Sequence, residues 1–336
     1  MKTQEKPRID LENRTKLEGV IPLQTPFVIF IDPADCCNFK CKFCPTGDRA
    51  LMKKVGRPFS VMDFDLYKKI IDDITEFKNP IKVLRLYKDG EPFMNPRFAD
   101  MIKYAKDKSC AGKIDTTTNA SFLTPEKSLE IIEAGLDRMN ISIEGVNSEQ
   151  YQSFSRSNLD FNKLVENIRF FYKNKKQCEV LIKTNGDVLS EQDKKDFYSI
   201  FSDICDKIYI EHIMSCWPSF ELDGVDVNEE VGIYGQKIKE VMVCPYVFYS
   251  ISINSDGTAS LCFLDWERKL IIGDAKKESL VDIWNGANMK NYQQAFLSGN
   301  RKEVPICNEC GQMTHGSPDN IDAFANEILE KLEGSI

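Results

Sequence analysis

The stretch FVIFIDPADCCNFKCKFC, residues 27–44, joins a short apolar run to a loop that holds four of the twelve cysteines of the chain. Residues 27–31 are aromatic or β-branched, which predicts a buried strand, and Asp32 and Pro33 mark its end. The cysteines therefore follow the carboxyl end of a strand. In α/β proteins ligands collect at that end, so the stretch predicts an α/β fold with a site beside its first strand.

Three of these cysteines, Cys37, Cys41 and Cys44, follow the spacing C-x3-C-x2-C. Thiolates this close together can hold three corners of one four-iron cube when the chain curls around it. A cube has four irons, so one iron would stay open to a further ligand. A zinc knuckle and buried structural cysteines are the alternatives. Cys36 lies beside the group, but it shifts the first spacing by one residue and fits the pattern less well than Cys37.

Helices and strands are expected to alternate beyond this loop. Apolar residues at helical spacing predict helices at residues 62–77, 98–106, 125–134, 161–172 and 193–204, and short apolar runs predict strands at 27–31, 81–87, 113–117, 139–143, 179–184 and 207–213. Strands separated by helices of this length imply parallel pairing with right-handed crossovers. The fold class is therefore α/β, as a doubly wound sheet or as a full or partial barrel.

The composition excludes several classes of protein. Apolar residues make up 42% and charged residues 29%, and no stretch approaches the roughly 20 apolar residues of a membrane span. The charged N-terminus lacks the apolar segment of a secretion signal, so we expect a soluble, cytoplasmic protein without a membrane partner. A net charge of -8 argues against a nucleic-acid partner. In a reducing cytoplasm twelve cysteines indicate metal ligation in place of disulfides.

A second cysteine group occupies the C-terminal region. Its members follow the spacing C-x17-C-x44-C-x2-C and are Cys244, Cys262, Cys307 and Cys310. A hairpin is expected between the first two, with strands at 247–253 and 258–263 around a turn at 254–257. Four thiolates can close a site completely, and cysteine chemistry alone leaves structural zinc and a four-iron cluster equally open. A terminal helix is expected from an apolar stripe at Ile321, Phe324, Ala325, Ile328 and Leu332.

The first cysteine loop, with Phe43 before its last cysteine, resembles the signature of the radical S-adenosylmethionine (SAM) superfamily. Gly90, Glu91 and Pro92 are similar to the GGEP segment of that family, although Lys88 and Asp89 precede them and replace its first glycine. The resemblance implies a SAM-binding four-iron cluster on Cys37, Cys41 and Cys44, the three residues that carry the catalysis. The residues that it assigns to SAM are Phe43, Gly90, Glu91, Pro92, Thr118, Asn119, Ser142, Glu144 and Arg156.

The second group then resembles the single-cluster "twitch" form of the SPASM domain, including the segment DIWNG at 282–286. This implies a second, auxiliary four-iron cluster on the four C-terminal cysteines. The expected fold is a partial (β/α)6 TIM-like barrel with a small C-terminal twitch domain. Its expected parts are an N-terminal extension at 1–24, the barrel at 25–238, the twitch domain at 239–316 and a C-terminal helix at 317–336.

The resemblance implies that SAM is cleaved to a 5'-deoxyadenosyl radical, which removes a hydrogen atom from a substrate. The cysteine spacing is similar to that of a twitch-type aminocyclitol dehydrogenase, so we expect oxidation of a sugar-, cyclitol- or nucleotide-like small molecule. A flavodoxin or ferredoxin would supply the reducing electron.

Three alternatives stay open. The chain could modify a peptide, or it could catalyse a redox-neutral epimerisation with Cys216 as hydrogen donor, or it could be a non-catalytic iron-sulfur carrier. The chain has two histidines, His212 and His315, so a lysine, arginine, carboxylate or water is favoured over histidine as the base. The remaining cysteines, Cys110, Cys178 and Cys205, are expected in the core.

Overall fold

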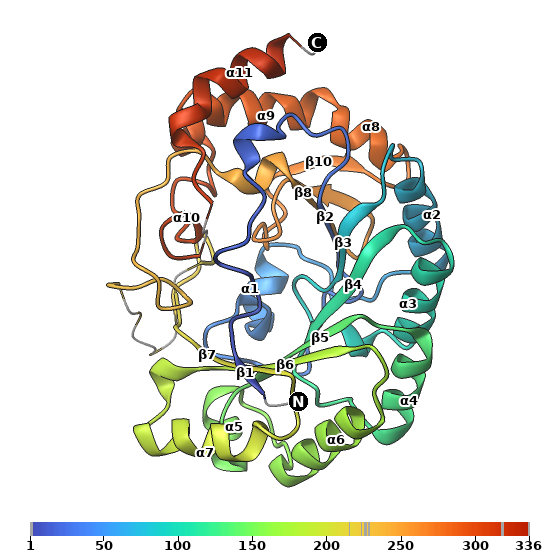
Figure 1. Ribbon diagram of the computed structural model, residues 1–336, viewed down its shortest axis with the longest axis vertical. Coiled ribbons are helices and arrows are strands. Elements are labelled where there is room, and N and C mark those ends of the chain that lie inside the picture. The colour runs from blue at the N-terminus through green and yellow to red at the C-terminus, as the bar shows by residue number, and fades with distance from the viewer. Residues whose placement is uncertain are drawn as a thin grey trace.

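The structure is a computed structural model that describes residues 3–214, 216–222, 224, 227, 229–316 and 319–334. Its strands form one ten-stranded sheet in the order β1-β7-β6-β5-β4-β3-β2-β8-β9-β10. The sheet curves into an open barrel, and most of the helices between the strands cover its outer face (Figure 1). The expectation of an α/β partial barrel is confirmed.

The elements lie close to the expected ranges. The strands are β1 (Gln4–Glu5), β2 (Val28–Ile31), β3 (Ile81–Leu86), β4 (Ala111–Thr118), β5 (Arg138–Ile143), β6 (Glu179–Asn185), β7 (Lys207–Glu211), β8 (Ser250–Ile253), β9 (Thr258–Ser260) and β10 (Ile271–Asp274). The helices are α1 (Arg49–Lys54), α2 (Phe64–Thr75), α3 (Phe98–Asp107), α4 (Pro125–Ala134), α5 (Ser148–Phe154), α6 (Phe161–Asn174), α7 (Glu191–Phe201), α8 (Leu280–Asn285), α9 (Ala287–Leu297), α10 (Gln312–His315) and α11 (Ala325–Glu333).

Local sequence explains where the barrel helices begin and end. The Thr124 side chain caps α4 by accepting a hydrogen bond from the backbone of Lys127, and Pro125 occupies the first turn, where no amide donor is needed. Gly135 ends α4 with φ 87°, the left-handed conformation that glycine adopts most readily. Ser190 and Asp193 form a reciprocal capping box at the start of α7.

Strands β2 to β7 pair in parallel, so their carboxyl ends meet at one rim of the barrel. The apolar side chains of the helices, such as Tyr67, Ile70 and Ile71 of α2, are buried against the outside of the sheet. The inside carries polar and charged residues, including Arg85, Asp115 and Arg138. The barrel interior therefore carries polar and charged groups that can bind a ligand, while the apolar core lies between the sheet and the helices.

Two expectations about the C-terminal region are wrong in detail. Residues 247–249 do not extend the hairpin, because the 3-10 turn Pro245–Phe248 precedes β8 and aligns it in parallel with β2. Phe324 was expected in the apolar stripe but is 38% exposed, since the 3-10 turn Asp322–Phe324 rotates it away from the buried face of Ile328 and Leu332. The antiparallel pairing of β8 with β9 is confirmed.

The N-terminal segment also joins the sheet. Strand β1 pairs in parallel with β7, and the chain then runs along the open side of the barrel towards the 3-10 turn Leu17–Gly19, drawn in dark blue in Figure 1. No helix within the described residues combines the length and the apolar character that a membrane crossing requires.

Candidate SAM and iron-sulfur site

The first cysteine loop is held in a curl by backbone hydrogen bonds. The amide of Lys40 donates to the carbonyl of Ser155 at 2.9 Å, and the amide of Lys42 donates to that of Phe154 at 3.2 Å. The ring of Phe43 stacks on Phe154 with a centroid distance of 5.3 Å. These contacts fix the loop to the end of α5.

The three thiols of this loop face the same region. Burial raises the pKa of Cys37, Cys41 and Cys44, and the pKa of Cys41 is raised further by the charges of Glu144 and the other two cysteines. Thiolates are the metal-binding form of cysteine, and a cluster of buried thiolates needs a cationic centre to offset their mutual repulsion. The donor set therefore fits three ligands of an iron-sulfur cube. Cys36 points elsewhere, because its thiol donates to the carbonyl of Ser60 at 3.7 Å.

The GEP segment packs directly on this loop. The amide of Glu91 donates to the carbonyl of Cys36 at 2.8 Å, and a Cβ at position 90 would collide with the carbonyl oxygens of Ala34 and Cys36. Gly90 is therefore required by the close approach of two backbones. Pro92 is buried and starts the 3-10 turn Pro92–Met94.

Glu91 links the segment to the end of β4. Its carboxylate accepts hydrogen bonds from the Thr118 hydroxyl at 2.6 Å, the Asn119 amide at 2.8 Å and the Phe93 amide at 3.1 Å. Burial nevertheless raises the pKa of Glu91 to about 7. The side-chain amide of Asn119 lies 3.9 Å from the sulfur of Cys37, so β3, β4 and the cysteine loop meet here.

A cavity of about 230 Å³ opens at the carboxyl ends of the strands, and we call it the strand-end cavity. Phe43, Ser142 and Glu144 line it. Burial raises the pKa of Glu144 to about 7, and one of its oxygens is buried without a hydrogen-bond partner. That oxygen suits a donor group of a bound molecule such as SAM. Arg156 does not line the cavity: it is exposed at the end of α5, with φ 51°.

The four C-terminal cysteines also come together. Burial raises the pKa of each, and the pKa values of Cys244, Cys262 and Cys307 are raised further by the charges of other members of the group. The guanidinium of Arg301 donates from Nε to the carbonyl of Met242 at 2.8 Å and also bonds the carbonyl of Cys307. Four thiols, of which Cys244 is buried and the others half-buried, lie in front of this cation and form a donor set that can close a metal site.

Residues next to both cysteine groups line one cavity, although no cysteine of either group lines it itself. Phe263, which follows Cys262, lines the strand-end cavity and stacks on Phe30 at 4.9 Å. Cys216 lines the same cavity, and its pKa is raised to about 12 by burial first and then by the charges of Cys310 and Cys44. The cavity thus lies between the two cysteine groups.

Trp266 and the remaining cysteines are structural. Trp266 is buried outside this cavity and donates to the carbonyl of Pro218 at 2.8 Å. Cys110, Cys178 and Cys205 are buried in the core, as expected.

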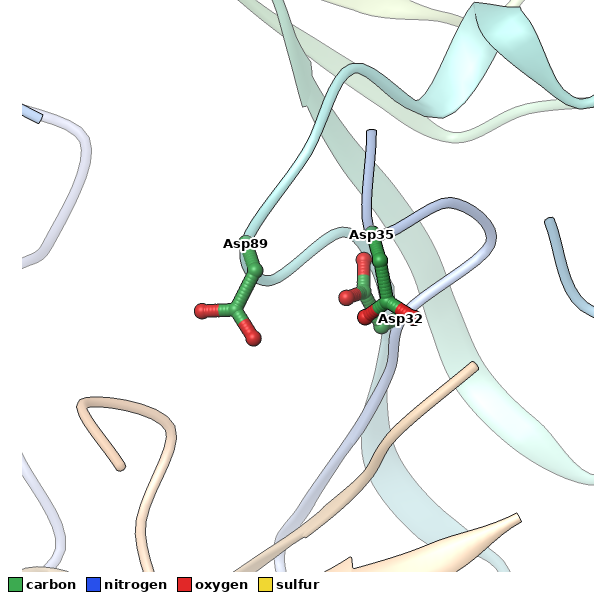
Figure 2. A group of neighbouring side chains, drawn as sticks. All are labelled: Asp32, Asp35 and Asp89. Carbon is green, nitrogen blue, oxygen red and sulfur yellow. The ribbon is translucent and has the colours of Figure 1, made fainter. Parts of the chain in front are cut away.

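A buried acidic group lies beside the first cysteine loop, and no pattern in the sequence indicates it. Asp32 and Asp35 follow β2, and Asp89 lies on the loop after β3, with one oxygen of each within 4.8 Å of the others (Figure 2). Arg268 and Ser255 of the C-terminal region both bond Asp35, and Lys88 bonds Asp89 at 2.5 Å. Neither carboxylate oxygen of Asp32 has a hydrogen-bonding partner among the described residues. Burial, followed by the charges of Asp35 and Asp89, raises the pKa of this carboxyl.

His212 was not among the residues expected at the site. The structure places it on the wall of the strand-end cavity, with Nδ1 2.8 Å from Oδ1 of Asp187. The other oxygen of Asp187 accepts from the amide of Ile213. A histidine oriented by a carboxylate is a common arrangement for proton transfer. The one sequence feature that could have indicated this role is the position of His212 directly after the strand β7.

Two family models match the chain. Residues 31–204, more than half of its length, match the radical SAM superfamily, and residues 244–311 match SPASM, an iron-sulfur cluster-binding domain. The chain therefore belongs to the radical SAM superfamily. Within it, this chain carries a SPASM domain. Its cofactors are SAM, a four-iron cluster and additional iron-sulfur clusters in the C-terminal region.

Curated relatives match part of the chain. A GTP 3',8-cyclase of Limosilactobacillus fermentum is 32% identical over 38% of this chain and 36% of its own length. A second relative is the tungsten-containing aldehyde ferredoxin oxidoreductase cofactor-modifying protein of Pyrococcus furiosus. It is 29% identical over 34% of this chain and 30% of its own length. The chain thus spans about a third of the length of the curated relatives it matches.

Solved structures share the fold at low identity. BtrN in complex with AdoMet and 2-DOIA has a TM-score of 0.55 and 16% identity, and the match covers 88% of this chain and 97% of BtrN. Streptococcus suis SuiB bound to the precursor peptide SuiA has a TM-score of 0.62 and 14% identity. The match covers 89% of this chain and 72% of SuiB. These likenesses establish the architecture of barrel and C-terminal module.

Proposed function

We propose that this enzyme removes a hydrogen atom from a small sugar-, cyclitol- or nucleotide-like molecule and oxidises it by two electrons, with an auxiliary four-iron cluster as electron acceptor. The observation that carries the proposal is the position of the strand-end cavity between the two cysteine groups, with Phe43 on one side and Phe263 on the other. A substrate in this cavity would lie close to both. BtrN, whose fold covers both modules, holds AdoMet and 2-DOIA.

The bound cofactors would supply the 5'-deoxyadenosyl radical and accept the second electron. We assign Cys37, Cys41 and Cys44 as ligands of the SAM-binding cluster, and Cys244, Cys262, Cys307 and Cys310 as ligands of the auxiliary cluster. Glu91, Thr118 and Asn119 would hold SAM from one side, and Ser142 and Glu144 from the other. Arg156 is the weakest member of the expected set, because it is exposed. Glu91, Thr118 and Asn119 do not line the cavity either, but they are buried beside the first cysteine loop.

Oxidation of an alcohol also requires a proton acceptor. His212 lines the cavity, and Asp187 fixes its ring through Nδ1, which leaves Nε2 for the substrate. We assign His212 as the base and Asp187 as the residue that orients it. The protein would work in the cytoplasm with a flavodoxin or ferredoxin as reductant.

Epimerisation is the second candidate, and the position of Cys216 favours it. A redox-neutral reaction needs a hydrogen donor to the substrate radical, and the thiol of Cys216 lines the cavity. A donor thiol would introduce solvent deuterium into the product, whereas oxidation would not.

The experiment that tests the proposal uses anaerobically reconstituted enzyme, reductant, SAM and candidate substrates in deuterated water. We expect 5'-deoxyadenosine together with a product two hydrogens lighter than the substrate. Replacement of Cys37, Cys41 and Cys44 by alanine should abolish both products, while Cys178→Ala, a buried cysteine outside both groups, should not. A product of unchanged hydrogen count that contains one deuterium, and loses it in Cys216→Ala, would favour epimerisation; a modified peptide would contradict the small-molecule assignment.

A further inference from the structure

A second cavity of about 390 Å³ adjoins the strand-end cavity inside the barrel, and we call it the barrel cavity. The two cavities share the lining residues Arg8, Tyr87, Phe263 and Gln312. Arg8 belongs to the N-terminal segment that runs along the open side of the barrel. Its backbone is anchored there, because Arg138 of β5 donates to its carbonyl at 2.7 Å.

Most charged groups inside the barrel are neutralised by one another. Arg85, Asp115, Arg138 and Glu179 lie in one register across β3 to β6, with charged atoms 3.7 to 3.9 Å apart. Higher in the barrel, Lys183 pairs with Glu211. Arg14, the other arginine of the N-terminal segment that lines the barrel cavity, pairs with Asp319.

Arg8 differs from these groups. It makes no ion pair with any carboxylate of the described residues, and its side chain donates one hydrogen bond, from Nε to the hydroxyl of Tyr234 at 3.1 Å. A guanidinium inside a protein is costly unless it is paired, and its terminal nitrogens form a planar fork that matches a phosphate or a carboxylate. Lys82, at the wall of the same cavity, also lacks a described carboxylate partner.

Hydroxyl groups complete the site around Arg8. The phenol oxygens of Tyr87, Tyr234 and Tyr246 each accept a hydrogen bond, from Arg85, Arg8 and Gln312, respectively. Their own protons have no acceptor among the described residues, so all three can donate into the cavity. The set is thus rich in donors and cations, although the whole chain carries a net charge of -8. A protein with a net negative charge repels anions in general, so any attraction of an anion must come from these local groups.

From this arrangement we infer that Arg8, with the hydroxyls of Tyr87 and Tyr234, binds an anionic group of the substrate, a phosphate or a carboxylate. The inference rests on the proposed function, since it places the reacting carbon in the strand-end cavity and the anionic group in the barrel cavity. The N-terminal segment thereby contributes a specificity residue to the barrel.

Equilibrium binding to the reconstituted full-length protein tests this inference, with inorganic pyrophosphate and succinate as probes. We expect saturable binding of at least one probe, with an affinity about tenfold to a hundredfold lower in Arg8→Gln, since a charge-assisted hydrogen-bond pair is lost. Arg8→Lys keeps the charge without the fork and should bind with intermediate affinity. The probe that binds more tightly identifies the anion as phosphate or carboxylate.

Arg169→Gln is the matched control, because Arg169 is an exposed arginine of α6 paired with Asp203 and lines neither cavity. Thermal unfolding confirms that each variant is folded. Equal affinity of wild type and Arg8→Gln, or no binding of either probe to wild type, would overturn the inference. Formation of 5'-deoxyadenosine by wild type is measured separately, and its failure would count against the proposed function without affecting the anion-binding result.

Discussion

The hydroxyl of Thr118 donates a hydrogen bond to the carboxylate of Glu91 at 2.6 Å, which joins the end of β4 to the GEP segment. Burial raises the pKa of Glu91 to about 7 in the folded protein. The ionised form is the one that can accept from the methionine ammonium group of SAM. SAM affinity should therefore rise as the pH increases through about 7.

Glu91→Gln should weaken SAM binding about tenfold and reduce this pH dependence, because one charge-assisted hydrogen bond is removed. Binding measured between pH 6 and pH 8 checks this. The pKa of Glu144 is also raised to about 7, so Glu144→Gln is the comparison variant that separates the two carboxylates. If Glu91→Gln binds SAM like wild type at every pH, Glu91 has no role at the site.

Gly90→Ala should disturb the first cysteine loop. The new Cβ would collide with the carbonyl oxygens of Ala34 and Cys36, and overpacking of this kind costs about 1–3 kcal/mol. We expect a lower denaturation midpoint and incomplete iron incorporation at the first site. Gly19→Ala is the control, because a Cβ there meets nothing within 4 Å.

Asp32 predicts a pH dependence of stability. Its pKa is raised in the folded protein by burial and by Asp35 and Asp89, whereas an unfolded aspartate titrates near 3.9. The stability contributed by the protonated carboxyl is therefore complete below about pH 4 and is lost as the pH rises through the raised value. Asp32→Asn, which mimics the protonated form, should make the unfolding free energy fall less steeply with pH. The exposed Asp203→Asn should leave the slope as in wild type.

The C-terminal cysteines predict an iron count. With two four-iron clusters the reconstituted protein should hold about eight irons per chain, and Cys310→Ser should hold about four. Cys205→Ser, in the core, should retain about eight. A zinc ion in place of the second four irons would contradict the auxiliary-cluster assignment.

His212→Gln should slow formation of the oxidised product by about 100-fold or more, the usual contribution of a general base. Asp187→Asn should have a smaller effect, because the ring of His212 stays in the cavity but loses its orienting carboxylate. Product formation under initial-rate conditions is the measurement, and His315→Gln is the control. Equal rates in wild type and His212→Gln would exclude this residue as the base.

The sequence predicted the barrel well because its signals are local. Helical periodicity places α4 at its expected bounds, and Gly135 ends it in the left-handed conformation. The two cysteine groups could be predicted for the same reason, since the spacing between the cysteines can be read directly from the sequence. In contrast, the pairing of β8 with β2 joins segments more than 200 residues apart, and no local pattern indicates it.

The cavity walls were harder to predict. Arg8, Lys88 and His212 become part of the interior only when the N-terminal segment and the strand ends meet there. Arg156 shows the reverse difficulty: its order along the chain matches the family pattern, but the turn after α5 leaves it exposed, and its contact with SAM stays a prediction. Pairing between distant charged groups is decided by tertiary structure, which spacing does not encode.

The parallel pairing of β2 with β8 has a consequence for how the chain can be divided. Strand β2 has β3 on one side and β8 on the other, so a chain cut after residue 240 would leave the edge of β2 unpaired. An exposed strand edge of this kind is a template for association with other molecules. Removal of the C-terminal module should therefore favour association of the barrel with other molecules. A replacement module from a relative would have to supply a strand that pairs with β2 in the same register.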